Sequence, residues 1–244
     1  MASNYGSGKV GRVEDKMFVC IDAAASSTIE QFGGRTISGS ISASNYTPSS
    51  AGKTAKAFVL ANGGSEYGSF TGSRDWNWRG DYSYEFIACK ETSANRQYVF
   101  SQLQTNSPWN GICHPLMSHD GDGNLQEWGG NYVSHTGAFG FWDTGISLDN
   151  NKWYYCAGTW SGNSRKAYVR TVGDSSFTTA TTTSYGAMTG SEAVNPFVVG
   201  GNASGLSTSH MFDGAIAMIR MYKTQLTDNE VEQNFNAQRD RYGL

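Results

Sequence analysis

The chain of 244 residues has little proline, few cysteines, no basic run and no long apolar segment. No stretch approaches the roughly 20 consecutive apolar residues that a membrane-spanning helix needs. The formal net charge is −3 and the Lys and Arg residues are dispersed. Nucleic-acid binding is therefore not expected, because neutralising phosphates requires a concentrated basic surface. We expect neither a membrane nor a nucleic acid as a partner.

The four cysteines, Cys20, Cys89, Cys113 and Cys156, show no CxxC spacing, so a structural zinc site is not expected. All but Cys113 lie in apolar, strand-like runs. The simplest interpretation is small buried hydrophobic residues with free thiols, as in a protein made in a reducing cytoplasm. The start of the chain also lacks the apolar core of a secretion signal. We expect a protein that is used without export by a signal of its own.

Glycine, at 30 residues, and aromatic residues, at 13% of the sequence, are abundant. Apolar runs alternate with glycine-containing turn signals such as Asn62-Gly-Gly and Gly80-Asp, which is typical of a β-rich chain. Several runs are almost continuously apolar, which indicates central strands or a covered outer face. The expected strands are Met17–Asp22, Ala55–Ala61, Tyr82–Lys90, Gln97–Leu103, Gly111–Met117, Ala138–Asp143, Trp153–Thr159, Lys166–Val172, Pro196–Gly201 and Gly214–Tyr222.

The last thirty residues predict a strand that runs into a capped helix. Thr227 is placed as the N-cap, and Glu230, three residues on, completes a capping box. Leu226 before the cap and Val231 after it are positioned to form a hydrophobic staple. We expect a helix near Asp228–Gln238 that packs against the edge of a β-sandwich.

This closing segment, Phe-x-Gly-x-Ile…Arg-x-Tyr…Leu-Thr-x-x-Glu-Val-x-x-Asn-Phe-x-Ala…Arg-Tyr-Gly, resembles the last strand and helix of concanavalin A-like, laminin-G-like jelly-roll modules. The ending resembles in particular the versions found in tailed-phage virion proteins. Three earlier stretches are similar to the opening strand, the central hairpin and the penultimate strand of that fold: Phe18–Ala24, Asp149–Val169 and Phe197–Asn202. The resemblance implies an all-β, concanavalin A-like antiparallel β-sandwich (jelly roll) with one short C-terminal helix.

The resemblance further implies a non-enzymatic structural protein of a tailed-phage virion, as capsid decoration or tail component. It would be synthesised in the host cytoplasm and contact other virion proteins and copies of itself. Residues 17–244 would form one domain, and the polar, Gly/Ser-rich residues 1–16 an extended arm along a neighbouring chain. The fold alone does not decide the function. The alternatives are a carbohydrate-binding adhesin that recognises host surface glycans and, behind it, a glycanase.

The carboxylates that a glycanase needs are missing from the sequence. A retaining glycanase of this fold carries two carboxylates about 5 Å apart, in a Glu-x-Asp-x-x-Glu pattern that the chain does not contain. Glu85 and Glu91 are the nearest pair on one stretch, with no Asp between them, and we expect them to be solvent-facing strand charges. No Gly-x-Ser-x-Gly elbow or paired His motif is present either. The sequence thus predicts no enzyme.

A group of aromatic residues between positions 76 and 142 is the main candidate for a carbohydrate site. Rings can stack on the C–H faces of sugars while neighbouring Asn, Asp and Arg groups read the hydroxyls. The alternative is packing in the core or at a subunit interface. The residues are Trp76, Trp78, Trp109, Trp128, Tyr132 and Trp142. Trp153 and Trp160, in the expected hairpin, are assigned to the core.

The turn Asp120-Gly-Asp-Gly-Asn is the main candidate for a metal site. Asp120, Asp122 and Asn124 place oxygen atoms at alternating positions, as a calcium loop does. Leu125 and Asn131, however, stand where the helix–loop–helix form needs a glycine and a bidentate Glu. The alternative is a glycine-rich turn whose side chains cap their own backbone. No cofactor is expected, with calcium as the alternative.

Overall fold

The computed structural model describes residues 17–24, 30–31, 44–47, 54–61, 67–70, 80–93, 96–101, 110–118, 121–131, 140–171, 173–185, 197–201, 211–242 and 244. The proposed arm, residues 1–16, lies outside these ranges, as do five of the nine predicted site residues. Those five are Trp76, Trp78, Trp109, Asp120 and Tyr132.

The largest layer is a nine-stranded antiparallel sheet with the path β13-β12-β11-β6-β15-β1-β2. Off this path, β4 pairs with both β15 and β3. The strands are β1 (Met17–Asp22), β2 (Glu30–Gln31), β3 (Ser44–Tyr46), β4 (Ala55–Leu60), β6 (Tyr82–Lys90), β11 (Tyr154–Ser161), β12 (Ser164–Thr171), β13 (Thr178–Thr182) and β15 (Gly214–Tyr222).

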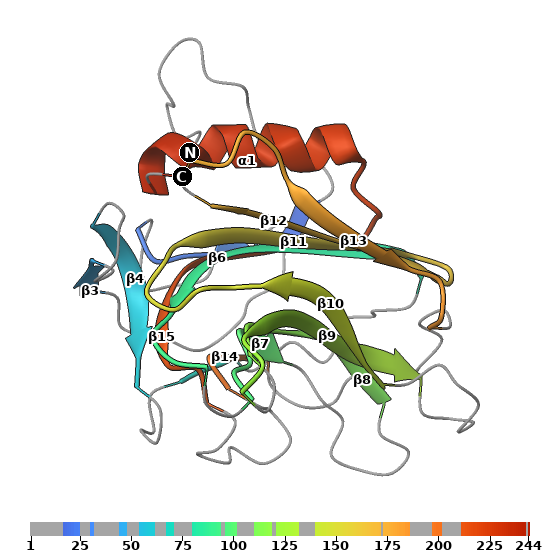
Figure 1. Ribbon diagram of the computed structural model, residues 1–244, viewed down its shortest axis with the longest axis horizontal. Helices are drawn as coiled ribbons and strands as arrows, with labels where there is room; N and C mark the ends of the chain where they lie inside the picture. The colour runs from blue at the N-terminus through green and yellow to red at the C-terminus, as the bar shows by residue number, and fades with distance from the viewer. Residues whose placement is uncertain are drawn as a thin grey trace.

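Two three-stranded antiparallel sheets form the second layer, with the orders β10-β9-β8 and β5-β14-β7. They lie on one face of the large sheet, and the helix α1 lies across the opposite face (Figure 1). Their strands are β5 (Gly68–Phe70), β7 (Phe100–Ser101), β8 (Asn110–Leu116), β9 (Asn124–Asn131), β10 (Gly140–Ser147) and β14 (Phe197–Val199), and α1 is Asp228–Tyr242. The prediction of an all-β antiparallel sandwich with one C-terminal helix is confirmed.

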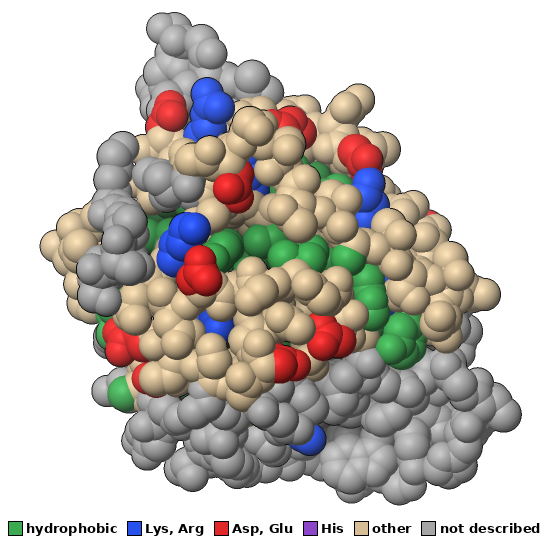
Figure 2. All heavy atoms as spheres, in the orientation of Figure 1, with side chains coloured by type: hydrophobic (Ala, Val, Ile, Leu, Met, Phe, Trp, Pro, Cys, Tyr) green, Lys and Arg blue, Asp and Glu red, His purple; other side chains and the backbone are tan. Residues whose placement is uncertain are grey.

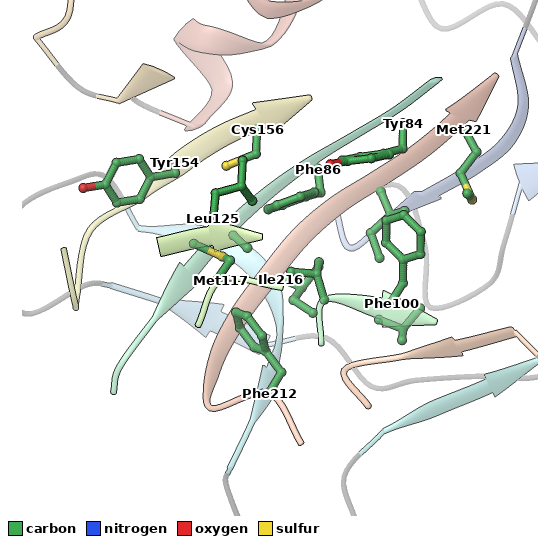
Figure 3. Packing of buried hydrophobic residues seen from close by; sticks show 14 of the residues in the cluster. Tyr84, Phe86, Phe100, Met117, Leu125, Tyr154, Cys156, Phe212, Ile216 and Met221 are labelled. Atoms are coloured by element: carbon green, nitrogen blue, oxygen red, sulfur yellow. The ribbon is translucent and has the colours of Figure 1, made fainter. Parts of the chain in front are cut away.

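The inner core fills the space between the two layers. Alternate residues of a strand point to the same face, so Tyr84 and Phe86 of β6 both face inward. They meet Phe100 from β7 and Leu125 from β9, all with no more than 1% exposure (Figure 3). These contacts hold the small sheets against the large one.

A second core lies between the large sheet and α1. Ile87, Tyr155 and Met218, on the outer face of the sheet, pack with Val231 and Phe235 of the helix. Burying each of these two helix side chains contributes about 1.5–3 kcal/mol. The expected position of the helix at the sandwich edge is therefore wrong, because the apolar outer face of the central strands is what needs covering. This layer also explains why those strands are almost continuously apolar.

The capping box at the start of α1 is confirmed. The Glu230 N–H donates to Thr227 Oγ1 (3.3 Å), and the Thr227 N–H donates to Glu230 Oε2 (2.8 Å). The helix continues four residues beyond the predicted end. Its last turn is anchored to the sheet, because the Arg241 guanidinium donates to both carboxylate oxygens of Asp22 (2.7 and 2.9 Å) and Tyr242 is buried.

The sequence prediction placed the long apolar strands correctly and missed polar ones. The bounds of β1, β6 and β15 agree with the prediction residue for residue. The strands β9, with polar residues such as Gln126 and Glu127, and β13, with four threonines, were not predicted. Neither segment contains the apolar run that indicates a strand in the sequence. The predicted burial of Trp153 and Trp160 is confirmed, as is that of Cys20, Cys89 and Cys156, which form no disulfide bond with another described residue.

The helix α1 is polar over much of its length, with acidic residues in its first turn and basic residues in its last turn. Across the described ranges, no helix has the length and apolar character needed to cross a membrane.

Candidate functional site

The most distinctive polar group between the layers is Glu127 of β9, whose side chain points at the large sheet. It is 2% exposed, and Tyr84 of β6 donates a hydrogen bond of 2.5 Å to Glu127 Oε1. Gly158 of β11 makes this approach possible, because a Cβ at that position would overlap both the Tyr84 ring and the Glu127 carboxylate. A glycine within a strand is typical of such a close approach.

The surroundings of Glu127 shift the pKa of its carboxyl group toward neutral pH. Burial raises the pKa of Glu127 from 4.5 to about 7, while the Arg165 charge and the Tyr84 hydrogen bond oppose this rise. A carboxyl group with such a pKa can take up or release a proton near neutral pH. Strongly perturbed groups gather at functional sites, although structural networks contain them too.

Arg165 of β12, whose charge lowers the pKa of Glu127, stacks on two aromatic rings. Its side chain is fully buried, and its guanidinium carbon lies 3.3 Å from the Trp160 ring centre and 4.2 Å from the Tyr185 ring centre. Such stacking of a guanidinium on aromatic faces is favourable. We call Tyr84, Glu127, Trp160, Arg165 and Tyr185 the Glu127 cluster.

One of the predicted sugar-binding residues lies beside this cluster. Trp142 of β10 is directly opposite Glu127 in the strand register, so the two side chains share a face. Trp142 is 7% exposed and belongs to the inner core. The backbone of Trp128 lies on β9, where it pairs with Phe141 and His114. The predicted carbohydrate site thus stays a prediction, with Trp142 available to a ligand only if the sandwich opens there.

The sequence analysis identified none of Tyr84, Glu127 and Arg165 as site residues. A usable signal was present in Gly158, an isolated glycine within the apolar run of β11. It marks the point where another backbone or side chain comes close. The identity of the approaching residue is set by the pairing of β9 in a different sheet, which local sequence does not reveal.

The two described residues of the predicted calcium turn bind within the turn and to β10. Asp122 Oδ1 accepts a hydrogen bond from the Asn124 N–H (3.0 Å), and the Asn124 amide donates to both oxygens of Asp143 (3.2 Å each). Gln126 donates to the second oxygen of Asp122. Among the described residues, no group of three His, Cys, Asp or Glu side chains is placed to hold a metal. These contacts favour backbone capping, and calcium remains an untested alternative.

The carboxylates of Glu85 and Glu91 have different environments. Glu85 is fully buried beneath α1, where it lies 3.3 Å from Arg220 and accepts a hydrogen bond from Asn234. The expectation of a solvent-facing charge is therefore wrong for Glu85, because the helix covers this face. Burial raises the pKa of Glu85, while Arg220 and Asn234 lower it. Glu91 is exposed and accepts a hydrogen bond from the Tyr46 hydroxyl (2.8 Å).

A family model described as "Concanavalin A-like lectin/glucanases superfamily" matches residues 62–232 of the chain. The search of curated proteins finds no match.

Solved structures with the same fold come from functionally different proteins. Domain 4 of AbnA, a GH43 extracellular arabinanase from Geobacillus stearothermophilus in complex with arabinotriose, is 17% identical with a TM-score of 0.55, covering 91% of this chain and 98% of that one. The binding domain of botulinum neurotoxin DC in complex with rat synaptotagmin II is 11% identical with a TM-score of 0.60, covering 91% and 52%. Trypanosoma rangeli sialidase in complex with sialic acid is 13% identical with a TM-score of 0.55, covering 93% and 34%. The chain thus spans about half of the neurotoxin binding domain and a third of the sialidase, and these likenesses concern the fold.

Proposed function

The chain belongs to the concanavalin A-like lectin/glucanase superfamily, and within it we propose a non-enzymatic structural protein of a tailed-phage virion, as capsid decoration or tail component. The observation that supports the non-enzymatic part is the placement of Glu85 and Glu127. Glu85 lies on the outer face of the large sheet under α1, whereas Glu127, on β9 of a small sheet, points at the inner face of the large sheet. Two carboxylates on opposite faces of a sheet cannot flank one glycosidic bond.

The groups that act on the Glu127 carboxyl are also unsuited to glycoside hydrolysis. The charged and hydrogen-bonding groups that shift its pKa are Arg165 and Tyr84, and neither is a carboxylate. A single carboxyl group can exchange a proton but cannot supply both the acid and the base or nucleophile of the reaction. We expect no release of reducing sugar from polysaccharides by the protein. Release that is lost in Glu127→Gln would overturn this part of the proposal.

The virion assignment rests on the closing segment, whose residues resemble tailed-phage modules. In the fold this segment, β15 and α1, carries the contacts that close the outer layer, including Arg220 to Glu85 and Arg241 to Asp22. Acidic and basic side chains are interspersed on the face shown in Figure 2, with no basic patch among its described residues. Such a surface suits contacts with other virion proteins and copies of the chain better than contacts with nucleic acid.

The direct test is to locate the protein. Tailed-phage particles produced from a genome that carries this gene should be purified on a density gradient, and their proteins should be identified by mass spectrometry. We expect the chain to co-purify with the particles at a fixed stoichiometry to the major structural proteins. Recovery only in the soluble fraction of the lysate would refute the assignment. A variant without residues 2–14 should fold with a nearly unchanged melting temperature but enter particles less efficiently, if residues 1–16 are an assembly arm.

Carbohydrate binding is the second candidate, favoured by the likeness to an arabinanase domain solved with arabinotriose. A glycan array probed with the purified protein tests it. The predicted site requires the aromatic group, so Trp76→Ala and Trp109→Ala should weaken any binding, whereas Val59→Ala, an exposed position on β4, should not. Binding that survives both tryptophan variants would place the sugar elsewhere.

A further inference from the structure

The strand β13, orange in Figure 1, is the last strand at one end of the large sheet. It pairs with β12 in a regular register over all five of its residues, from Thr178 to Thr182. Within the described part of the chain, no other strand pairs with it. A strand with one open edge presents main-chain N–H and C=O groups that can pair with a strand of another chain.

The features that usually protect such an edge are missing around β13. Exposed edges are commonly very short, bent by a bulge, or occupied by charged residues or proline. Residues 175–191 contain no charged residue and no proline. The end strands β2 and β3 of the same sheet have only two and three residues, and β2 contains Glu30. The edge of β13 is therefore the one that is suited to receive a further strand, and its threonines favour the extended conformation.

The sequence of β13, Thr-Thr-Ala-Thr-Thr, reads the same in both directions. Two copies that pair antiparallel about a two-fold axis at Ala180 place each Ala180 opposite the other. Thr179 then lies opposite Thr181, and Thr178 lies opposite Thr182. Threonine pairs across antiparallel strands are favourable. The strand is thus complementary to itself, as an interface between two identical subunits requires.

The faces of β13 also fit this pairing. Ala180 lies opposite Ala167 of β12 and packs against the inner core, so Thr179 and Thr181 point to the outer face. Both of these threonines are exposed. Opposite residues of an antiparallel pair point to the same face of a sheet. The pairing therefore joins inner face to inner face, and the two large sheets become one continuous sheet.

The nearest charges do not oppose the contact. Arg165 and Lys166 are the charged residues of β12 that pair with β13. The Lys166 ammonium lies 2.7 Å from Asp228, and the Arg165 guanidinium stacks on the Trp160 ring. The two copies of β12 would be three strand spacings apart, about 14 Å. This exceeds the Debye length of about 8 Å at physiological ionic strength, so like charges on the two copies repel each other little.

We propose that β13 is a self-association edge, through which two copies of the chain pair antiparallel about a two-fold axis at Ala180. Five residues from each copy make a smaller contact than the roughly 20–30 residues a side of a standard interface. The free protein should therefore form a weak dimer that depends on concentration. The proposal specifies a surface for the contacts between copies included in the proposed function, and it rests on that function only for its role in a particle. There, neighbouring copies are held at a high local concentration, which favours a weak contact.

The test is analytical ultracentrifugation of the purified protein from micromolar to millimolar concentration at low ionic strength. The wild-type protein should convert from monomer to dimer as the concentration rises. Thr179→Lys/Thr181→Lys puts two ammonium groups opposite each other at two places, and should raise the dissociation constant of the dimer about ten-fold or more. Thr179→Glu/Thr181→Lys puts a carboxylate opposite an ammonium at the same two places, and should keep or strengthen the dimer.

The two double variants are matched, because they change the same exposed positions and differ only at residue 179. Their melting temperatures at low concentration show that both are folded. A wild-type protein that stays monomeric at millimolar concentration overturns the proposal, and so does a dimer that both variants form equally well. Loss of the dimer in both variants contradicts the axis at Ala180. Each of these results leaves the density-gradient test of the virion assignment unaffected, because no particle is involved.

Discussion

Arg220 and Glu85 lie opposite each other on β15 and β6, 3.3 Å apart, and neither side chain has any exposure to solvent. The same carboxylate accepts a hydrogen bond from Asn234 of α1, so the ion pair ties the two central strands to the helix. An ion pair in this position does not add much stability by itself, because the desolvation of both charges opposes their attraction. The hydrogen bond from Asn234 adds a polar contact between α1 and the sheet, within an otherwise apolar contact layer.

Removing one member of this pair should be far more harmful than removing both. Arg220→Met leaves the Glu85 carboxylate buried without its cation, and we expect a loss of about 3–5 kcal/mol in the free energy of unfolding. The double variant Glu85→Gln/Arg220→Met should recover a large part of that loss. Urea denaturation of the three proteins measures both values. Equal stability of the single and double variants would show that the charge of Glu85 is not what makes the single variant unstable.

The N-cap of α1 offers a smaller and independent effect. Thr227→Ala removes the hydroxyl that accepts from the Glu230 N–H, and should lower the free energy of unfolding by about 1 kcal/mol. Thr181→Ala, at an exposed position on the edge strand β13, is the control and should change stability by less than about 0.5 kcal/mol. Chemical denaturation compares the two. A cost for Thr227→Ala no larger than that of the control would contradict the capping assignment.

Local sequence predicted those parts of the fold that depend on local interactions. The helix start followed from the spacing of Thr227 and Glu230, and the long apolar strands followed from their own composition. The end of the helix did not, because it is set by a contact between Arg241 and Asp22, 219 residues away. The strand β9 was missed for the same reason, since its polar residues form a strand only where two neighbouring strands pair with them.

The candidate site was less accessible to prediction than the fold. Glu85 looked like a surface charge because the sequence of β6 does not show what covers the outer face of the sheet. The position of α1 determines that this face is buried. Arg165 and Tyr84 come together with Glu127 through contacts between layers, which no sequence spacing encodes. Trp142, predicted as a sugar-binding residue with core packing as the alternative, is buried in the inner core, and its role in binding a sugar stays a prediction.

Gly158 should not tolerate even the smallest side chain. A methyl group there would collide with the Tyr84 ring and the Glu127 carboxylate, so we expect Gly158→Ala to cost about 1–3 kcal/mol through overpacking. The Tyr84→Ala background removes one of the two obstacles, and in it Gly158→Ala should cost less. A double-mutant cycle on the free energy of unfolding gives this coupling. Independent, additive costs would mean that the two residues do not share the space.

Glu127 should make the protein less stable as the pH rises. Its native pKa of about 7 lies above the unfolded value near 4.5, so between these pH values the native state holds more protons than the unfolded state. The free energy of unfolding therefore falls as the pH increases from about 4.5 through 7, by roughly 3 kcal/mol for this group alone. Glu127→Gln, which cannot ionise, should lack this part of the slope and be more stable than wild type at pH 8. Because all other groups titrate in both proteins, the difference between their stability profiles isolates Glu127. A constant difference across this pH range would mean that folding does not raise the pKa of Glu127.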